Sequence, residues 1–288
     1  YSIVELSGGG YTIAGGTSST GAGSTDVYVV NIDDNGAVQW TQTYGGSGYD
    51  YGYDIKATSD GGYIIAGYTL SFGAGQADAY LIKTDANGSS SWTKVIGGDG
   101  EDAAWSVIET SGGYALTGNT ESFGSGDKDV LFVLTDASGT PTVTRAIGGS
   151  GVDYGNDLIQ TADGGFAIVG YSKSFNSNGD DVYLIKTDAS GDVVWSRTYG
   201  GAFNDRGWSI QEAGGGELVI AGNSQSFGLS IASGYWEYYL LRTDAGGDSK
   251  CNVGGATSTE IDTVGLPVTI GGLGGAGGAT SAASTTET

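Results

Sequence analysis

Carboxylates are the most numerous side chains in this sequence that could take part in catalysis or bind a metal ion. It contains 33 Asp and Glu residues against 11 Lys and Arg, one cysteine (Cys251) and no histidine. Without histidine, Ser-His-Asp and Cys-His catalysis and the common His-containing metal sites are excluded. A pair of carboxylates can still cleave a glycosidic bond, and Asp54 and Asp157 are the candidates. Because these two occupy equivalent positions in near-identical segments, they offer no distinct acid and nucleophile. We therefore expect a protein that is not an enzyme, with a glycosidase as an alternative.

Calcium is the metal that the acidic residues suggest. The loop from Gly98 to Asp102 offers the carboxylates of Asp99, Glu101 and Asp102, and Ca²⁺ binds several carboxylate and carbonyl oxygens. An Asp-x-Asp-x-Asp-Gly calcium loop is absent from the sequence. We therefore expect no required cofactor, with calcium as the ion that this loop would take.

Two acidic positions recur along the chain. The first comprises Asp50, Asp102, Asp153 and Asp205, and the second comprises Asp26, Asp78, Asp129 and Asp181, with Glu237 as the fifth counterpart. A carboxylate at such a position either binds a cation or accepts hydrogen bonds from loop amides and holds adjacent loops in place. A binding site usually breaks the symmetry of its scaffold, so the recurrence favours the structural interpretation.

Aromatic residues at one position vary along the chain and are candidates for recognition. Tyr53, Trp105 and Trp208 stand at equivalent places, with Tyr51 and Tyr154 nearby. Rings interleaved with carboxylates can stack on sugar faces while the acids accept hydrogen bonds from hydroxyl groups. The alternative is that these rings fill gaps between sheets near a central axis. The sequence leaves both interpretations open.

An internal repeat organises these residues. The segment GGYTIAGGT at Gly9 returns at Gly61, Gly112, Gly164 and, more loosely, at Gly216, which is a period of 51 or 52 residues. A fixed period of this length signals a repeat architecture. Each unit offers four short alternating or apolar runs, such as 53–58, 63–68, 79–84 and 91–96. Such spacing suits four antiparallel strands and leaves no room for crossover helices.

The predicted fold is therefore all-β: a five-bladed β-propeller of four-stranded antiparallel blades. The expected units are about 1–46, 47–98, 99–149, 150–201 and 202–255. Residues 256–288 form a Gly-, Ser- and Thr-rich connector or tail with a strand-capable segment at 261–270. This segment either contributes half of a sixth blade, pairs with the ring, or is donated to another molecule.

A hairpin motif recurs between the third and fourth runs. It has the spacing Asp-x-x-Gly-x-x-x-Trp and is formed by Asp33, Gly36 and Trp40, by Asp85, Gly88 and Trp92, and by Asp188, Gly191 and Trp195. Asp and Gly suit a tight hairpin, and the Trp would then pack across the junction between blades.

These motifs resemble the tandem propeller repeats of secreted and cell-surface proteins of bacteria and archaea. The resemblance rests on TSDGGYIIAGYT, YLIKTDANG and the following Trp, and it covers Tyr1 to about Gly255. The hairpin is more distantly similar to that of quinoprotein-like propellers, without implying their cofactor. The resemblance is specific for fold and weak for function.

Charge and composition limit the classes of molecule that this protein could bind. A formal charge of −22 repels phosphate backbones, so we expect no nucleic acid, and no run of about 20 apolar residues is present to form a transmembrane segment. We expect an extracellular or cell-surface structural protein that assembles with copies of itself into a fibre or surface layer, or alternatively a glycan-binding adhesin. Strand addition and apolar contacts would use Val264, Val268, Ile270, Tyr235 and Trp236.

Overall fold

The computed structural model describes residues 1–175, 179–227, 235–252, 259–262 and 268–270. These residues form an all-β structure of five antiparallel sheets and contain no helix. It follows that the described part of the chain offers no helix that could cross a membrane.

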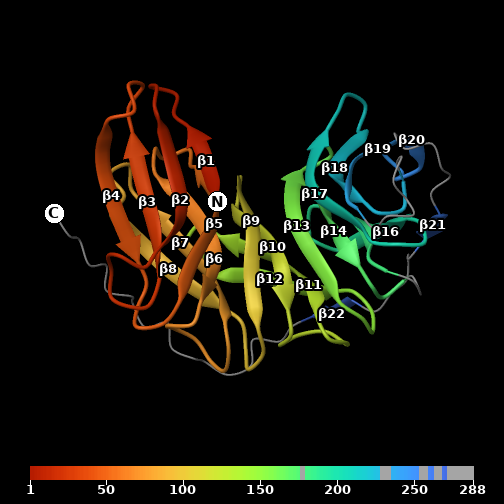
Figure 1. Ribbon diagram of the computed structural model, residues 1–288, viewed down its shortest axis with the longest axis horizontal. Coiled ribbons are helices and arrows are strands. Elements are labelled where there is room, and N and C mark those ends of the chain that lie inside the picture. Colours follow the sequence, from red (N-terminus) through yellow and green to blue (C-terminus); the bar gives the residue numbers. More distant parts are fainter. Residues whose placement is uncertain (176–178, 228–234, 253–258, 263–267, 271–288) are drawn as a thin grey trace.

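Each sheet is built around four strands that follow one another in the sequence, and the first of these four lies innermost (Figure 1). Sheet 1 contains β1 (Ser2–Glu5), β2 (Tyr11–Thr17), β3 (Asp26–Ile32) and β4 (Val38–Tyr44). Sheet 2 contains β5 (Asp50–Ala57), β6 (Tyr63–Thr69), β7 (Asp78–Thr84) and β8 (Ser90–Ile96). Sheet 3 contains β9 (Asp102–Thr110), β10 (Gly113–Thr120), β11 (Asp129–Asp136) and β12 (Pro141–Ile147). Sheet 4 contains β13 (Asp153–Gln160), β14 (Phe166–Ser172), β15 (Asp181–Thr187) and β16 (Val193–Gly200). Sheet 5 contains β17 (Asp205–Glu212), β18 (Leu218–Ser224), β19 (Glu237–Thr243) and β20 (Ser249–Asn252).

Successive sheets pack face to face and form four apolar cores, one at each junction. At the junction of sheets 1 and 2, for example, Val29 packs with Ile55 and Ile82. Burying one such side chain stabilises the fold by about 1.5–3 kcal/mol. The second and third strands of the three middle sheets are therefore buried almost throughout, as in β7, because both faces of these sheets are covered.

The first strands extend further than the sequence suggested. β5 begins at Asp50, three residues before the predicted run, because a bulge between Gly52 and Asp54 lets the strand continue past Tyr53. Gly67 lies opposite this bulge, inside β6. A Cβ at Gly67 would lie 1.7 Å from the carbonyl oxygen of Tyr51, so only glycine fits.

The hairpin motif joins neighbouring sheets. Asp33 accepts hydrogen bonds from the amides of Asn35 and Ala37, at 2.9 Å each, and Gly36 has a φ of 78°. Asp85 and Asp188 cap the equivalent hairpins at Gly88 and Gly191. Each Trp packs on the hairpin glycine of the following sheet: Trp40 on Gly88, Trp92 on Gly139 and Trp195 on Gly247.

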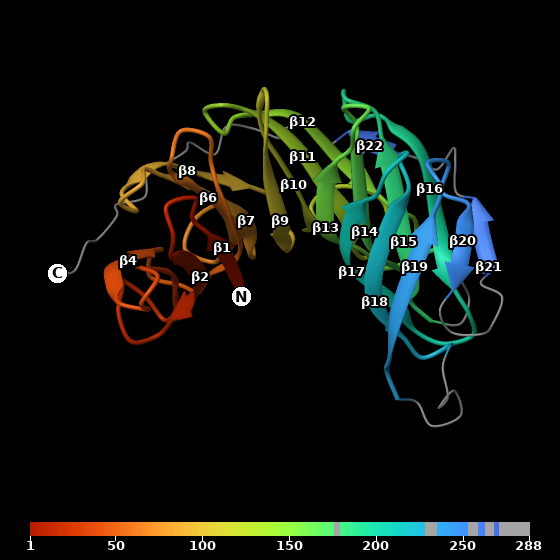
Figure 2. The same cartoon turned by 90° about the horizontal axis from the view of Figure 1, so that it is seen from above.

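The five sheets form an open arc (Figure 2). Sheets 1 and 5 lie at its two ends, with an opening between them. The tail strands that the structure describes do not lie in this opening. β21 (Thr259–Asp262) pairs with the outer strand of sheet 4, β16, and β22 (Val268–Ile270) pairs with the outer strand of sheet 3, β12.

Candidate functional site

A ladder of alternating serine and aspartate side chains crosses the inner strands. Ser2, Asp54, Ser106, Asp157 and Ser209 occupy the same position in successive sheets. Ser2 Oγ donates to Asp54 Oδ1 at 2.9 Å. Ser106 Oγ lies 3.4 Å from Asp54 Oδ2 and 3.0 Å from Asp157 Oδ1, and Ser209 hydrogen-bonds to Asp157. The ladder thus joins all five sheets along their first strands.

The two ladder aspartates also bind backbone amides of the following sheet. Asp54 Oδ2 accepts a hydrogen bond from the Val107 amide at 3.1 Å, and Asp157 Oδ2 accepts one from the Ile210 amide at 3.0 Å. Burial raises the pKa of Asp157, and these hydrogen bonds oppose the rise. Asp54 also forms an ion pair with Lys56 at 2.8 Å. Both carboxylates, which are the glycosidase candidates of the sequence, therefore hold neighbouring sheets together.

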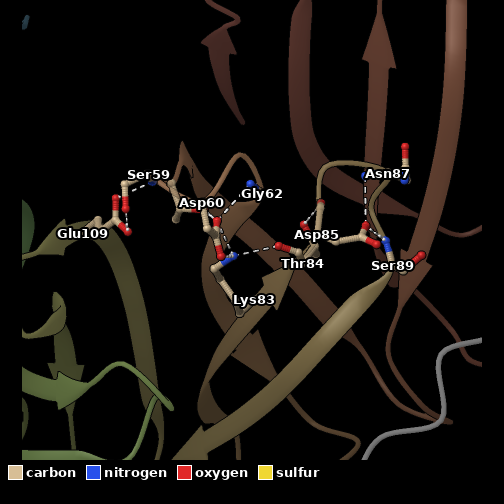
Figure 3. A network of polar contacts seen from close by, with 10 residues as sticks. Ser59, Asp60, Gly62, Lys83, Thr84, Asp85, Asn87, Ser89 and Glu109 are labelled. Atoms are coloured by element: carbon tan, nitrogen blue, oxygen red, sulfur yellow. Dashed lines mark hydrogen bonds and ion pairs between the residues drawn. The ribbon is translucent and has the colours of Figure 1, made fainter.

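A second set of contacts crosses two of these junctions at the hairpin after the first strand (Figure 3). Glu109 of sheet 3 accepts hydrogen bonds from the Ser59 amide at 2.7 Å and from Ser59 Oγ at 2.8 Å. Glu212 of sheet 5 accepts one from the Ala162 amide of sheet 4 at 2.8 Å. These glutamates were not identified from the sequence, because only the register of the sheets places them beside a neighbouring hairpin.

Beside the ladder, the structure gathers aromatic rings of sheets 1, 2 and 3. The ring centroid of Tyr53 lies 4.6 Å from that of Trp105, 4.9 Å from that of Tyr1 and 5.8 Å from that of Tyr68. Tyr51 packs on the Tyr68 ring at 5.3 Å. Of these rings Tyr1 is exposed and the others are half-buried. Burial raises the pKa of Tyr53, so its phenol stays neutral.

A second aromatic cluster lies on sheets 4 and 5. Tyr154 stacks on Tyr171 at 4.9 Å, and Tyr171 lies edge-on to Trp208 at 6.3 Å. The Arg206 guanidinium lies 4.5 Å from the Tyr171 ring and 5.3 Å from that of Trp236. The five predicted sugar-binding residues thus divide between two clusters. Tyr68 and Tyr171 complete them, and the signal that could have identified these two is the tyrosine that follows the strand glycine in units 2 and 4.

The recurring acidic residues meet as buried pairs at the loops between sheets. Gly97 separates Asp78 from Asp102: a Cβ there would lie 2.0 Å from Asp78 Oδ1 and 2.6 Å from Asp102 Oδ2. Three further glycines separate equivalent pairs, namely Asp26 with Asp50, Asp129 with Asp153, and Asp181 with Asp205. Burial, then the nearby Asp102 charge, raises the pKa of Asp78 to about 7, and burial raises that of Asp129 to about 7. These two carboxyls therefore keep a proton well above the usual range.

The second member of each pair fastens a loop. Asp102 Oδ2 accepts hydrogen bonds from the Gly98 amide at 2.9 Å and from Ser122 Oγ at 2.5 Å. Asp50 and Asp153 make the same two contacts with the amides of Gly46 and Gly149 and with the hydroxyls of Ser71 and Ser174. These are the contacts expected if each carboxylate accepts hydrogen bonds from loop amides and holds adjacent loops in place.

The predicted calcium ligands do not converge. Asp99 is exposed, and Asp102 is buried in its loop. Glu101 forms an ion pair with Lys128 at 2.7 Å, and Lys128 also lies 3.3 Å from Glu121. Among the described residues, no three His, Cys, Asp or Glu side chains form a group that could hold a metal ion.

The predicted assembly residues lie apart. Tyr235 is exposed, and Trp236 packs against Arg206 at the end of sheet 5. Val268 and Ile270 are the first and last residues of β22. Val264 lies outside the described residues.

Comparison with known proteins gives one curated relative but no family assignment. No family model matches the chain. Regulatory protein FlaEY of Caulobacter vibrioides is 27% identical over 229 residues, which are 68% of this chain and 24% of that protein. The match therefore spans about a quarter of the relative's length.

Proposed function

We propose that the chain is a non-catalytic β-propeller scaffold that acts outside the cell or on its surface. The five sheets are then its blades, since they pack face to face with their first strands innermost. The observation that carries this proposal is the serine and aspartate ladder. Both inner-strand acids are committed to contacts between sheets, where a catalytic pair would keep an open side for substrate.

A replacement series tests the non-catalytic part. Asp54→Asn and Asp157→Asn should lower the midpoint of thermal unfolding and leave no activity to lose on a broad polysaccharide panel. Turnover by the unmodified protein that disappears in both folded variants would contradict the proposal. Ser106→Ala serves as the matched control, because it weakens the same ladder without removing a carboxylate.

Self-assembly through the C-terminal segment is the second part of the proposal. Its support is the backbone pairing of β21 with β16 and of β22 with β12, which extends two sheets at their outer edges. Strand addition depends mainly on main-chain hydrogen bonds, so a strand that pairs within one molecule can also pair with the same edge of a copy.

Truncation after residue 256 should abolish assemblies larger than the monomer in light scattering and negative-stain microscopy. Thr269→Pro should weaken them, because proline removes a main-chain donor from β22. Ser284→Pro, in the same tail but outside both strands, should have no effect. Truncated protein that still polymerises would refute assembly through this segment.

Glycan binding is a second candidate function, and the Tyr53 and Trp105 cluster favours it. Half-buried rings beside hydrogen-bonding side chains provide the apolar faces and polar anchors that sugar sites use. Trp105→Ala should reduce binding on a glycan array at least about tenfold, which corresponds to roughly 1.4 kcal/mol. Phe203→Ala, an exposed aromatic outside both clusters, should leave it unchanged. An array without any hit for the unmodified protein would reject this candidate.

A further inference from the structure

The outward face of sheet 1 carries apolar side chains that are buried in every other sheet. Ile3 is 59% exposed, whereas its counterparts Ile55, Val107, Leu158 and Ile210 are at most 1% exposed. Tyr11 is 39% exposed, whereas Tyr63 and Tyr114 are buried. The buried counterparts all face the preceding sheet. Sheet 1 therefore presents the face on which a preceding sheet would pack.

Sheet 5 presents the opposite face. Leu240 is 47% exposed, whereas its counterparts Val29, Leu81, Phe132 and Leu184 are at most 1% exposed. Tyr238, two residues earlier on β19, is fully exposed. The buried counterparts all face the following sheet. The two ends of the arc are thus the two unmatched halves of the junction that the chain repeats four times.

The ladder specifies which kind of sheet fits between these ends. Sheets 2 and 4 are Asp-type, since Asp54 and Asp157 occupy the ladder position, and sheets 1, 3 and 5 are Ser-type, since Ser2, Ser106 and Ser209 occupy it. Each Asp-type sheet lies between two Ser-type sheets, whose hydroxyls contact its carboxylate. Both ends of the arc are Ser-type. A sheet that joins them would meet a serine hydroxyl on both sides.

The glutamate contacts repeat with the same period of two. Glu109 and Glu212, both on Ser-type sheets, cap the hairpin of the preceding Asp-type sheet. Glu5 holds the same position on sheet 1 and is exposed, and its carboxylate has no hydrogen-bond or ion-pair partner within the residues that the structure describes. It therefore stands where a preceding Asp-type hairpin would present its amides.

We infer that a further Asp-type repeat unit packs between sheets 5 and 1 and closes the arc. This occupant carries an inner-strand aspartate, which lies between the hydroxyls of Ser2 and Ser209 and accepts a hydrogen bond from the Ile3 amide. It also carries a Thr-x-Asp-Gly-Gly hairpin, which Glu5 caps. The alternation requires an even number of sheets in the closed ring, and six is the smallest. The inference rests on the proposed propeller arrangement. It adds that the exposed faces of sheets 1 and 5 together bind this further unit.

Two other occupants fit the ladder less well. A second copy of the described sheets that packs end to end would place Ser209 beside Ser2, with no carboxylate between them. The tail strands β21 and β22 already pair with β16 and β12. An Asp-type unit satisfies the apolar faces, the ladder and Glu5 together.

A pair of fusion proteins tests the inference. Residues 53–104, an Asp-type unit, are placed directly before Tyr1, which recreates the native connection from Ala104 to Trp105 because Tyr1 is the counterpart of Trp105. Hydrogen exchange at the Ile3 amide should slow at least about tenfold, and hydroxyl-radical labelling of Tyr238 and Leu240 should fall severalfold. The second fusion carries residues 105–155, a Ser-type unit. It should produce smaller changes both in the exchange of the Ile3 amide and in the labelling of Tyr238 and Leu240.

Point variants keep the test decisive if one fusion folds poorly. Ile3→Asp should leave the stability of the unfused chain unchanged, because Ile3 is exposed, but should remove the protection in the Asp-type fusion. Asp54→Asn within the added unit should do the same.

Equal protection by both fusions, or none at the Tyr238 end, would overturn the inference. A change in the oligomeric state of the unfused chain on Ile3→Asp would instead assign the face to a second copy and would also overturn it. The truncation test of assembly is independent of these outcomes.

Discussion

Trp40 of sheet 1 lies directly over Gly88 of sheet 2. A Cβ at Gly88 would fall 2.6 Å from the Trp40 ring, and Gly88 has a φ of 79°. Two independent requirements therefore select glycine: a backbone conformation that side chains rarely adopt and the approach of a neighbouring ring. The same relationship joins Trp92 to Gly139 and Trp195 to Gly247.

A pair of alanine variants separates these requirements. Gly36 has nearly the same φ, 78°, but a Cβ at Gly36 would meet nothing within 4 Å. Gly36→Ala should therefore cost only the backbone strain, about 1–2 kcal/mol. Gly88→Ala should cost a further 1–3 kcal/mol or so, because it overpacks the junction. The free energies of unfolding from denaturant titration check this, and equal costs would show that the tryptophan contact contributes nothing.

Asp54 should be the most sensitive position of the ladder. Asp54→Ala leaves the Val107 amide and the Ser2 hydroxyl without their acceptor, and each buried donor left unpaired costs about 1–3 kcal/mol. Ser2→Ala removes only one hydrogen bond at the half-buried end of the ladder and should cost about 1 kcal/mol. Chemical denaturation of both variants gives the comparison. A loss for Asp54→Ala no larger than that for Ser2→Ala would contradict the role of the ladder.

Much of the architecture follows from local sequence signals. The 51- or 52-residue period and the four runs per unit predict sheets of four antiparallel strands, and the Asp and Gly residues predict the hairpins. The contacts between sheets are less accessible to sequence analysis. Glu109 meets Ser59 across 50 residues of chain, and Asp54 meets Val107 across 53. Such pairs depend on how two sheets are stacked, which no local pattern specifies.

The opening of the arc does not follow from the sequence, whose repeats predict five blades around an axis. A repeat count says how many sheets form but not the angle between them. The decisive signals, the exposure of Ile3 and Leu240, exist only once the sheets are placed. The alternation of Ser and Asp is visible in the sequence, yet its meaning requires the hydrogen bonds of Ser2 and Ser106.

The buried carboxyl pairs predict that stability falls as the pH rises from about 4 to about 7. The pKa of Asp78 and of Asp129 is raised to about 7 in the folded state from 3.8. The folded protein therefore binds more protons than the unfolded chain between these values, so the stabilisation is complete below pH 4 and is lost as the pH approaches 7. Thermal unfolding midpoints between pH 4.5 and 8 should show the decline.

Neutral replacements provide the control for this pH dependence. Asp78→Asn and Asp129→Asn mimic the protonated carboxyl, so each should flatten the decline and raise the midpoint at pH 8 relative to the unmodified protein. Asp99→Asn, an exposed residue outside the pairs, should leave the profile unchanged. A midpoint that rises with pH over this range in the unmodified protein would mean that the pairs are not the dominant titrating groups.

The ion pair between the buried Lys83 ammonium and Asp60 predicts that stability falls as the pH becomes strongly acidic. This direction is opposite to that of the buried carboxyl pairs. Lys83 is 4% exposed, and its Nζ lies 2.8 Å and 3.0 Å from the two carboxylate oxygens of Asp60 (Figure 3). Hydrogen bonds from Lys83, then from Thr58 and the Gly62 amide, lower the pKa of Asp60 to about 2. Stability from this pair is therefore present above pH 4 and is lost as the pH falls through 2. Because the Asp60 side chain is largely exposed, solvent screening reduces the gain.

Two variants separate the ion pair from the burial of its ammonium. Asp60→Asn should destabilise by about 1–3 kcal/mol at pH 7, since it leaves a buried ammonium poorly compensated. The double variant Asp60→Asn with Lys83→Met should recover part of this loss, because it removes the buried charge itself. Denaturant titrations of the three proteins test this, and a double variant less stable than Asp60→Asn alone would show that Lys83 stabilises the hairpin through its contact with the Thr84 carbonyl oxygen.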